Sequence, residues 1–448
     1  MNRFFCSIIL SLIAFSASAQ SLFTPFEEKC PEASFSFCLK DVRTGVVEEQ
    51  YAAKKALAPA SVLKLLSSIA AFDKYGDDYQ FRTKVGYTGS IKKGILKGSL
   101  LIKASGDPTW NSKYFPENDV FSKIVKMIKA KGIDKIEWGL IIDEGDIDYS
   151  FPRTWIWEDI ANYFGSPVHA INLYDNTYKL DFSSSIAGSL THINSVMPLQ
   201  NNLNFINEVY ASKENIDDAW IFGGPNSSER IIKGSIPENR SSFIVKGSIS
   251  KTNELFAEQL RLALRKSNII CNNVLLVKKI TAYTSLGDLK WPSLSKIIHI
   301  TNQKSVNLFA EALSKKIGNI EKYWKSKSLN VNGIKLYDGS GVSRFNALSC
   351  EFLCDLLIYA DKQTYRQSLI NSLPKAGQTG TLKTFGKATC LEDNLIAKTG
   401  SMKAVRSYAG YITVGGQRKA FSCIVNNYSC TNKEIKELVE KLLISLCK

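Results

Sequence analysis

The sequence predicts a multi-domain α/β protein in which one α/β domain is interrupted by inserted segments. The chain has 448 residues, about three times the usual length of a domain. Helical periods of apolar residues alternate with strand-like runs before residue 145 and again after about residue 253. Between them, residues 171–245 are rich in Asn and Ser and show strand-like alternation without a strong helix pattern. Hydrophobic residues make up 44% of the chain and charged residues 22%, which excludes a disordered or fibrous protein.

Residues 1–19 have the pattern of a secretory signal peptide. Arg3 precedes the apolar stretch 4–15, and Ala17-Ser18-Ala19 offers a small-x-small cleavage site. An uncleaved membrane anchor is the alternative, but the run is short and ends in small residues. We therefore expect a secreted, periplasmic protein that is cleaved after Ala19.

The charge of the chain indicates its surroundings. The formal net charge is +15 at pH 7, which would attract a secreted protein to an anionic cell envelope. Such a charge could instead serve to bind nucleic acid. Because the lysines are dispersed and no arginine-aromatic stripe occurs, we expect no nucleic-acid partner.

The spacing of apolar residues predicts the first helices and strands of the chain. Residues 59–75 have apolar side chains at helical spacing, and Pro59 and Ser61 lie near the expected helix start. Residues 81–104 alternate and are broken by glycines, which predicts short strands and hairpins. The next predicted elements are an amphipathic helix over residues 120–130 and a buried strand over residues 137–143.

After about residue 253 the helical pattern returns. Predicted helices alternate with predicted strands there, which indicates that the α/β domain resumes. The helices cover residues 254–266, 306–317, 350–360 and 433–446, and the strands cover residues 394–397, 407–414 and 420–426.

Cysteine and histidine give no metal-binding pattern. Cys6 leaves with the signal peptide, so nine of the ten cysteines remain, and an odd number leaves at least one thiol unpaired. Cys350 and Cys354 lie i,i+4 on a predicted helix and are expected to be core residues rather than a disulfide. The three histidines form no HExxH, and paired CxxC spacing is missing. We predict no metal site and no cofactor.

Ser61-Val62-Leu63-Lys64 is an SxxK motif at the start of the first predicted helix. Residues i and i+3 share a helix face, so the lysine amine can reach the serine hydroxyl. Apolar burial and a second cation both favour the neutral amine, which can then take the serine proton. The spacing alone is common, because four other pairs match it: Ser90 and Lys93, Ser248 and Lys251, Ser293 and Lys296, and Ser372 and Lys375.

Two further motifs follow in order. Ser305-Val306-Asn307 is an SxN before a helical run, although Ser328-Leu329-Asn330 has the same form. Lys398-Thr399-Gly400-Ser401 contains the single KTG and follows a strand-like run. Gly400 lets the backbone approach a ligand closely, and an edge strand offers N–H and C=O groups to an extended peptide. This trio is typical of penicillin-binding proteins and class A β-lactamases.

Longer sequence segments indicate a more specific family. Residues 59–66 (PASVLKLL), 338–346 (DGSGVSRFN) and 105–108 (SGDP), and Leu373-Pro374 with residues 380–383 (GTLK), resemble the signatures of one group. That group is the low-molecular-mass class C penicillin-binding proteins, secreted D-alanyl-D-alanine carboxypeptidases/endopeptidases of the penicillin-binding protein 4 type. The 244 residues from Ser61 to Ser305 are similar to this group and far more than in a β-lactamase.

The resemblance implies a transpeptidase-like α/β domain with an antiparallel sheet and two inserted domains, the second rich in β-structure. The expected boundaries are a first part over residues 20–85, inserted domains over 86–170 and 171–245, and a second part over 246–448.

The resemblance also implies the catalytic roles. Ser61 is the nucleophile that attacks the penultimate D-alanine, and Lys64 is its base. Ser305 and Asn307 relay a proton and position the substrate amide, and Lys398 adds positive potential.

The remaining site residues also follow from the resemblance. The backbone N–H groups of Ser61 and Ser401 form the oxyanion hole, and Thr399 and Ser401, flanking Gly400, hold the terminal carboxylate. Asp159, Phe164 and Arg344 match the family residues that recognise diaminopimelate. Lys403 stands where related enzymes have glutamine, and it either favours a more acidic peptide terminus or lies in solvent.

Several candidate residues have structural alternatives. Asp338 and Arg344 either brace a loop as an internal ion pair or contact substrate. Tyr163 and Trp157 are expected to pack between domains rather than stack on a ligand.

Two further residues are expected to be structural. His169 is expected to be a satisfied structural histidine. Asp107 is expected to be a turn residue before Pro108.

The leading hypothesis is a periplasmic DD-peptidase that acts on peptidoglycan stem peptides and is acylated by β-lactams. A β-lactamase of the same superfamily is the alternative enzyme, but nothing marks a glutamate for fast deacylation. A silent wall-binding or β-lactam-sensing protein would have no reason to keep Ser61, Lys64, Ser305, Asn307 and Lys398. The oligomeric state stays open, a homodimer included.

Overall fold

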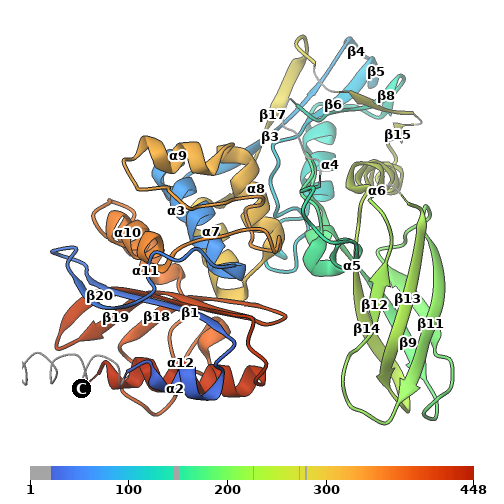
Figure 1. The fold of residues 1–448 in the computed structure, drawn as a ribbon. Coiled ribbons are helices and arrows are strands. Elements are labelled where there is room, and N and C mark those ends of the chain that lie inside the picture. Colours follow the sequence, from blue (N-terminus) through green and yellow to red (C-terminus); the bar gives the residue numbers. More distant parts are fainter. Residues whose placement is uncertain (1–21, 146–150, 226, 272, 278–279, 448) are drawn as a thin grey trace, which may run out of the picture. The chain divides into compact units, whose positions relative to one another are not determined.

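The chain forms two compact units in the computed structural model (Figure 1). The first comprises the chain up to Asp73, Ile298–Ser305 and Asn319–Lys448, and the second comprises Lys74–Ile297 and Val306–Gly318. The predicted signal peptide lies outside the described residues. None of the helices within those residues has both the length and the hydropathy of a membrane span. The structure describes residues 22–145, 151–225, 227–271, 273–277 and 280–447.

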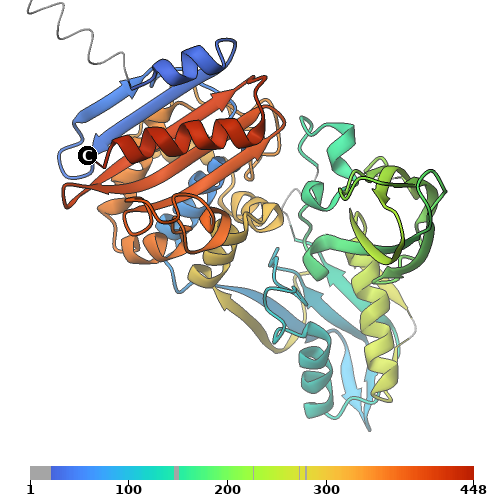
Figure 2. The ribbon, with the colours of Figure 1, turned by 90° about the horizontal axis from the view of Figure 1, so that it is seen from below.

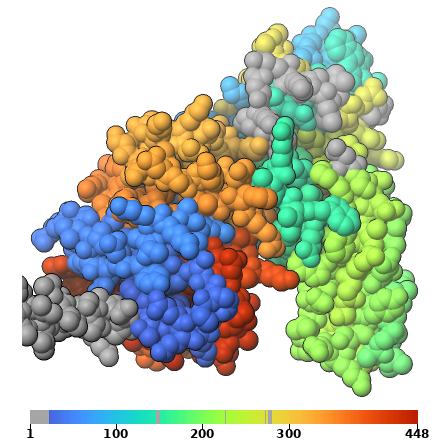
Figure 3. Space-filling view, in the orientation of Figure 1, coloured from blue at the N-terminus to red at the C-terminus, as the bar shows by residue number. Residues whose placement is uncertain are grey.

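The first unit is built on one five-stranded antiparallel sheet in the order β18-β19-β20-β1-β2. Segments from opposite ends of the chain meet in it, because β1 pairs with β20 along its whole length. Figure 3 shows their surfaces, blue and red, side by side. The predicted α/β class with an antiparallel sheet is confirmed. The strands are β1 (Ser34–Asp41), β2 (Val47–Tyr51), β18 (Leu395–Met402), β19 (Val405–Val414) and β20 (Gln417–Asn426).

Helices cover both faces of this sheet. Helix α10 packs on β1, β19 and β20 on one face, and α12 crosses the opposite face, as Figure 2 shows. The helices of the unit are α2 (Thr24–Lys29), α3 (Lys64–Tyr75), α7 (Leu294–Lys304), α9 (Ile320–Ser326), α10 (Cys350–Asp361), α11 (Arg366–Ser372) and α12 (Asn432–Ser445), with 3₁₀ turns η1 (Ala60–Leu63) and η4 (Gly380–Leu382). The division between the units falls within α3 and α7.

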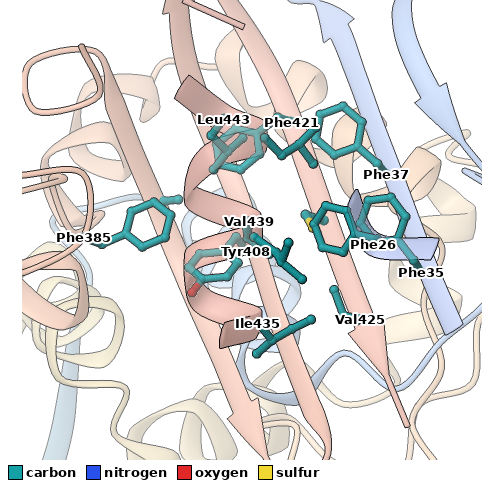
Figure 4. Packing of buried hydrophobic residues seen from close by; sticks show 14 of the residues in the cluster. Phe26, Phe35, Phe37, Phe385, Tyr408, Phe421, Val425, Ile435, Val439 and Leu443 are labelled. Carbon is teal, nitrogen blue, oxygen red and sulfur yellow. The ribbon is translucent and has the colours of Figure 1, made fainter. Parts of the chain in front are cut away.

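The core under α12 shows how periodicity builds this layer. Ile435, Val439 and Leu443 follow one another at i,i+4 on α12 and are all buried. They face Phe421 and Val425, which share one side of β20 because strand side chains alternate (Figure 4). Each large apolar side chain buried in this way stabilises the fold by about 1.5–3 kcal/mol.

Two disulfides join distant segments of the first unit. Cys30, at the end of α2, pairs with Cys430 just before α12, and Cys390 pairs with Cys447. Cys350 and Cys354 are buried free thiols on α10, so the prediction that they are core residues is confirmed. Among the described residues, the other free thiols are Cys38, Cys271 and Cys423, and all three are buried.

The second unit contains a five-stranded sheet in the order β16-β8-β6-β3-β17 and a four-stranded sheet in the order β15-β7-β5-β4. Helix α4 (Val120–Ala130) matches the predicted amphipathic helix, and its N-cap Asp119 accepts from the backbone N–H of Phe121. Two further helices of this unit are α6 (Thr252–Lys266) and α8 (Asn307–Ile317). The strands are β3 (Gln80–Tyr87), β4 (Ser90–Lys92), β5 (Ile95–Lys97), β6 (Ser99–Lys103), β7 (Lys135–Ile136), β8 (Gly139–Asp143), β15 (Ile270–Cys271), β16 (Val274–Val277) and β17 (Thr284–Ser293).

The segment predicted to be rich in strands folds into two three-stranded sheets, β10-β9-β14 and β11-β13-β12. Residues that precede it form the short helix α5 (Trp157–Ile160) and the turns η2 (Tyr163–Gly165) and η3 (Tyr174–Asn176). The strands are β9 (Thr177–Ser184), β10 (His192–Met197), β11 (Asn204–Ser212), β12 (Trp220–Phe222), β13 (Glu229–Pro237) and β14 (Arg240–Ser248).

Candidate active site

The serine and lysine of the SxxK motif are in hydrogen-bond contact. Ser61 lies in η1 and Lys64 begins α3, and the Lys64 Nζ is 2.9 Å from the Ser61 Oγ. The Lys64 side chain is fully buried, which fixes its amine at the hydroxyl. The predicted contact between the motif residues is confirmed, although a 3₁₀ turn rather than an α-helix carries the serine.

A loop of the 338–346 signature braces this pair. The Lys64 Nζ also donates to the carbonyl oxygen of Ser340 at 2.7 Å, and the Ser67 hydroxyl donates to that of Gly339. Gly341 has a φ of +88°, and a Cβ there would lie 2.0 Å from the carbonyl oxygen of Ala60. Only glycine allows the signature loop to approach the nucleophile so closely.

Asp338 holds this loop together. Its carboxylate accepts from the backbone N–H groups of Gly341 and Ser343 and from the Asn346 amide. Arg344, in the same loop, is exposed. Asp338 therefore braces the loop, as one alternative held, through two backbone N–H groups and the Asn346 amide.

The second and third motifs meet in the first unit. The Lys398 Nζ donates to the Ser305 Oγ at 2.9 Å and to the carbonyl oxygen of Thr399 at 2.7 Å. Ser305 has a φ of 56°, a left-handed conformation that is uncommon outside glycine and often marks functional positions. Burial lowers the pKa of the Lys398 amine well below its usual value, and the neighbouring Lys64 lowers it further.

The KTG segment lies on an edge strand against the nucleophile. β18 is the end strand of the sheet and includes Lys398, Thr399, Gly400 and Ser401. It is longer than the predicted strand 394–397, because the motif itself continues the ladder with β19. A Cβ on Gly400 would lie 2.8 Å from the backbone N of Ser61, so glycine brings the strand against the nucleophile.

A cavity of about 290 Å³ opens at this edge. It contains the nucleophile together with the hydroxyls of Ser305, Thr399 and Ser401, and the Thr399 Oγ1 donates to that of Thr381 at 2.8 Å. The residues that line the cavity are Ser61, Ser305, Thr381, Leu382, Phe385, Thr399, Ser401, Arg406, Tyr408 and Lys436.

Three predicted residues lie in the second unit. Asn307 begins α8, and its Nδ2 donates to the backbone carbonyl oxygen of Phe164 at 2.7 Å. Asp159 lies in α5, and a Cβ on Gly165 would be 2.1 Å from its carbonyl oxygen, so glycine folds the segment back on this helix. The structure thus joins Asn307 to the segment that carries Asp159 and Phe164.

Trp157 and Tyr163 each make one contact with the strands that follow but are 59% and 53% exposed, so their packing between domains stays a prediction. The ring of Trp157 lies 5.4 Å from that of Phe222, and the Lys246 Nζ lies 5.7 Å from the centre of the Tyr163 ring. Lys403, by contrast, is exposed in the turn between β18 and β19 and does not line the cavity.

The predictions for Asp107 and His169, both in the second unit, had different outcomes. Asp107 Oδ1 accepts from the backbone N–H and hydroxyl of Thr109, both at 2.6 Å, which confirms its turn role, and burial raises the pKa of Asp107 to about 7. Burial lowers the pKa of His169 to about 4. Its Nε2 has no hydrogen-bond partner among the described residues, so the prediction of a satisfied histidine is wrong.

Sequence reasoning missed the cationic end of the cavity. Arg406 and Lys436 line it with Ser61, but neither belongs to a motif. Thr381, another residue that lines the cavity, does belong to a recognised segment, GTLK. Over the part of the chain that is described, no group of three or more His, Cys, Asp or Glu is placed to bind a metal.

Comparisons with known proteins point to one family. The sequence model of the D-Ala-D-Ala carboxypeptidase 3 (S13) family matches residues 26–444. The D-alanyl-D-alanine carboxypeptidase DacB of Haemophilus influenzae is 28% identical over 469 residues, covering 97% of this chain and 94% of that protein. The crystal structure of penicillin binding protein 4 (dacB) from H. influenzae superimposes with a TM-score of 0.83 at 25% identity, covering 96% and 99% of the two chains.

A second crystal structure of that protein, complexed with a β-lactam, superimposes with a TM-score of 0.78 at 24% identity, covering 96% of this chain and 99% of the other. With a family match over residues 26–444, nearly the whole chain, the protein belongs to the D-Ala-D-Ala carboxypeptidase 3 (S13) family.

Proposed function

We propose that the protein is a serine-type D-alanyl-D-alanine carboxypeptidase and endopeptidase that hydrolyses peptidoglycan stem peptides and cross-links through an acyl-enzyme on Ser61. The observation that carries this is the 2.9 Å contact between the Lys64 amine and the Ser61 hydroxyl. A buried amine beside a second buried amine favours its neutral form, which is the form that accepts a proton.

In the acylation step, the Lys64 amine takes the Ser61 proton while Oγ attacks the carbonyl carbon of the penultimate D-alanine. The resulting oxyanion is stabilised by the backbone N–H groups of Ser61 and Ser401, a contribution that is often the largest in such reactions. The peptide C–N bond then breaks, and the departing amine takes a proton relayed through Ser305, which Lys398 orients at 2.9 Å. Water hydrolyses the ester and frees Ser61.

The other roles complete the proposal. Asn307 positions the substrate amide, and Thr399 and Ser401 beside Gly400 bind the terminal carboxylate. The residues that the resemblance assigns to the substrate side chain, Asp159, Phe164 and Arg344, stay predictions, as does any role of Lys403.

The setting of this activity is the periplasm. The signal-peptide pattern of residues 1–19 supports export and cleavage after Ala19, and the +15 charge supports attraction to the anionic envelope. The β-lactam complex of the similar H. influenzae protein supports acylation of this chain by β-lactams.

A fluorescent penicillin tests the proposal. The wild type should take up the label and hold it for hours, and Ser61→Ala should take up none. A label that is lost within seconds would instead indicate a β-lactamase, and no label on the wild type would indicate a silent binding protein.

Substrate preference needs a second assay. Release of D-alanine from a peptide ending in D-Ala-D-Ala measures carboxypeptidase activity, and cleavage of a purified cross-linked muropeptide measures endopeptidase activity. Activity on either that is absent from Ser61→Ala supports the proposal, and activity on neither contradicts it.

A further inference from the structure

A groove of about 990 Å³ lies between helices α4 and α6 of the second unit (Figure 1). The two helices are in contact, and the strands that follow them, β7 after α4 and β15 after α6, pair with each other in parallel. Both helices therefore end at the same end of the groove. Lys126 and Lys129 of α4 and Leu262 and Lys266 of α6 are among the residues that line it, and none of its described lining residues also lines the catalytic cavity.

Three lysines give one end of this α4–α6 groove a positive charge. Lys129 and Lys266 lie in the last turns of α4 and α6, and Lys126 lies one turn earlier on α4. All three are exposed, and within the described residues none of their ammonium groups makes an ion pair or a hydrogen bond. The single carboxylate among the described lining residues is that of Asp119, which caps the opposite end of α4. The lysine end is therefore complementary to a ligand that carries negative charge.

The remainder of the groove combines apolar surface with a few polar groups. Val125 and Ala263 are partly buried in its walls, and Leu262 is 45% exposed. Gln259 and Ser267 add an amide and a hydroxyl. The volume is at the upper end of the range of about 300–1,000 Å³ that is usual for ligand clefts, which also combine apolar walls with a few polar groups. The groove therefore fits a short peptide that has small apolar side chains and free carboxylates.

We propose that the α4–α6 groove is a second, non-catalytic site for the peptidoglycan substrate and binds a stem peptide through its carboxylates. This inference rests on the proposed function and adds a place where the polymer is held. Stem peptides consist of small residues such as alanine and carry free carboxylates, so they match both the apolar walls and the lysines. The polymer presents many such peptides, and holding one of them raises the effective concentration of the others around the enzyme.

Binding to insoluble peptidoglycan tests the inference directly. Ser61→Ala, which cannot turn the polymer over, is sedimented with purified sacculi over a range of protein concentrations. Replacing Lys126, Lys129 and Lys266 together by alanine in this parent should raise the apparent Kd by about 10-fold, because each exposed ion pair contributes about two- to threefold. Added salt should weaken the binding of the parent, because it screens exposed charges.

Matched controls separate the groove from the net charge. Replacing Lys92, Lys179 and Lys213 by alanine removes the same charge from exposed positions of the second unit outside the groove and should leave the Kd unchanged. Replacing the three groove lysines by arginine keeps their charge and should retain binding. Sacculi whose carboxylates have been converted to amides should bind the parent about as weakly as untreated sacculi bind the alanine variant of the groove.

Turnover gives a second measurement. In the active enzyme, the alanine variant of the groove should lose about 10-fold in kcat/KM for D-alanine release from sacculi relative to release from a soluble tripeptide that ends in D-Ala-D-Ala. The reason is that a short soluble peptide gains nothing from a second site, whereas a polymer does. Uptake of fluorescent penicillin reports that each variant is folded.

The outcomes are distinct. If the alanine variant of the groove sediments with sacculi as well as the control variant does, the second site is wrong, while penicillin acylation and D-alanine release stand. Binding through these lysines to phosphatidylglycerol vesicles but not to sacculi would also overturn it, because the groove would then bind lipid headgroups. If the wild type takes up no penicillin and releases no D-alanine, the proposed function fails, and sedimentation with sacculi still decides whether the groove binds the polymer.

Discussion

Adding a single methyl group at Gly400 should have a large effect on catalysis. A Cβ there would lie 2.7 Å from the carbonyl oxygen of Pro59 and 2.8 Å from the backbone N of Ser61. The nearest atom of all, the Ser407 Oγ, can rotate away, but these two atoms belong to the backbone, so no side-chain rotation relieves their contacts. Reaching an ordinary separation of about 3.5 Å requires a shift of about 0.8 Å between β18 and the nucleophile.

The size of the effect follows from that shift. A misplacement of about 1 Å in a catalytic site can slow a reaction by about 100-fold. We therefore expect Gly400→Ala to lower the second-order rate of acylation by fluorescent penicillin by about 100-fold. The added methyl should also destabilise the fold by about 1–3 kcal/mol through overpacking, which thermal unfolding would measure.

A matched control separates the local effect from a general one. Gly224, in the second unit, has its nearest neighbour at 3.9 Å from an added Cβ and no left-handed φ. Gly224→Ala should acylate at the wild-type rate. If folded Gly400→Ala acylated within threefold of the wild type, the close approach of β18 to Ser61 would not be what the catalytic geometry requires.

Other predictions concern pH and stability. Because burial and Lys64 lower the pKa of Lys398, its amine should lose its proton, and with it the positive potential it supplies, well below the usual lysine value of about 10.4. Acylation should therefore fall as pH rises through that lowered pKa, and a fall that begins only near the usual lysine value of about 10.4 would refute this. Burial raises the pKa of Asp107 to about 7, so the folded state binds the extra proton and stability should decrease from about pH 4 to pH 7, by at most about 4 kcal/mol. Asp107→Asn keeps the Oδ1 acceptor and should flatten this dependence in thermal unfolding; an unchanged profile would contradict the assignment. Replacing both Cys30 and Cys430 by serine should lower the free energy of unfolding of the first unit by about 2–4 kcal/mol, and an unchanged denaturant midpoint would show that the bond adds no stability.

Elements with a clear period could be predicted from the sequence. The amphipathic helix over residues 120–130 was predicted at its observed bounds, because its apolar face is set by local spacing. Strand β1 was not predicted: it is buried along nearly its whole length, so it shows no alternation of polar and apolar residues. Its place in the sheet depends on pairing with β20, almost 400 residues away.

Contacts in the active site likewise include some that the sequence predicts and some that it does not. The contact of Ser61 with Lys64 follows from i,i+3 spacing and was predicted. The approach of Arg406 to Ser401 depends on the register of β18 against β19, and the contact of Lys64 with Ser340 joins residues 276 positions apart. Such contacts are fixed by tertiary structure, and no local pattern marks them.

The central claim is that the Lys64 amine activates the Ser61 hydroxyl, and substitution of that amine tests it most directly. Lys64→Met keeps a long apolar side chain in the buried site but cannot accept a proton. Benzylpenicillin acylation, followed by intact mass with peptide mapping, should place the adduct on Ser61 in the wild type. In folded Lys64→Met its rate should fall by about 100-fold or more. An adduct on another residue, or a Lys64→Met rate equal to that of the wild type, would contradict the claim.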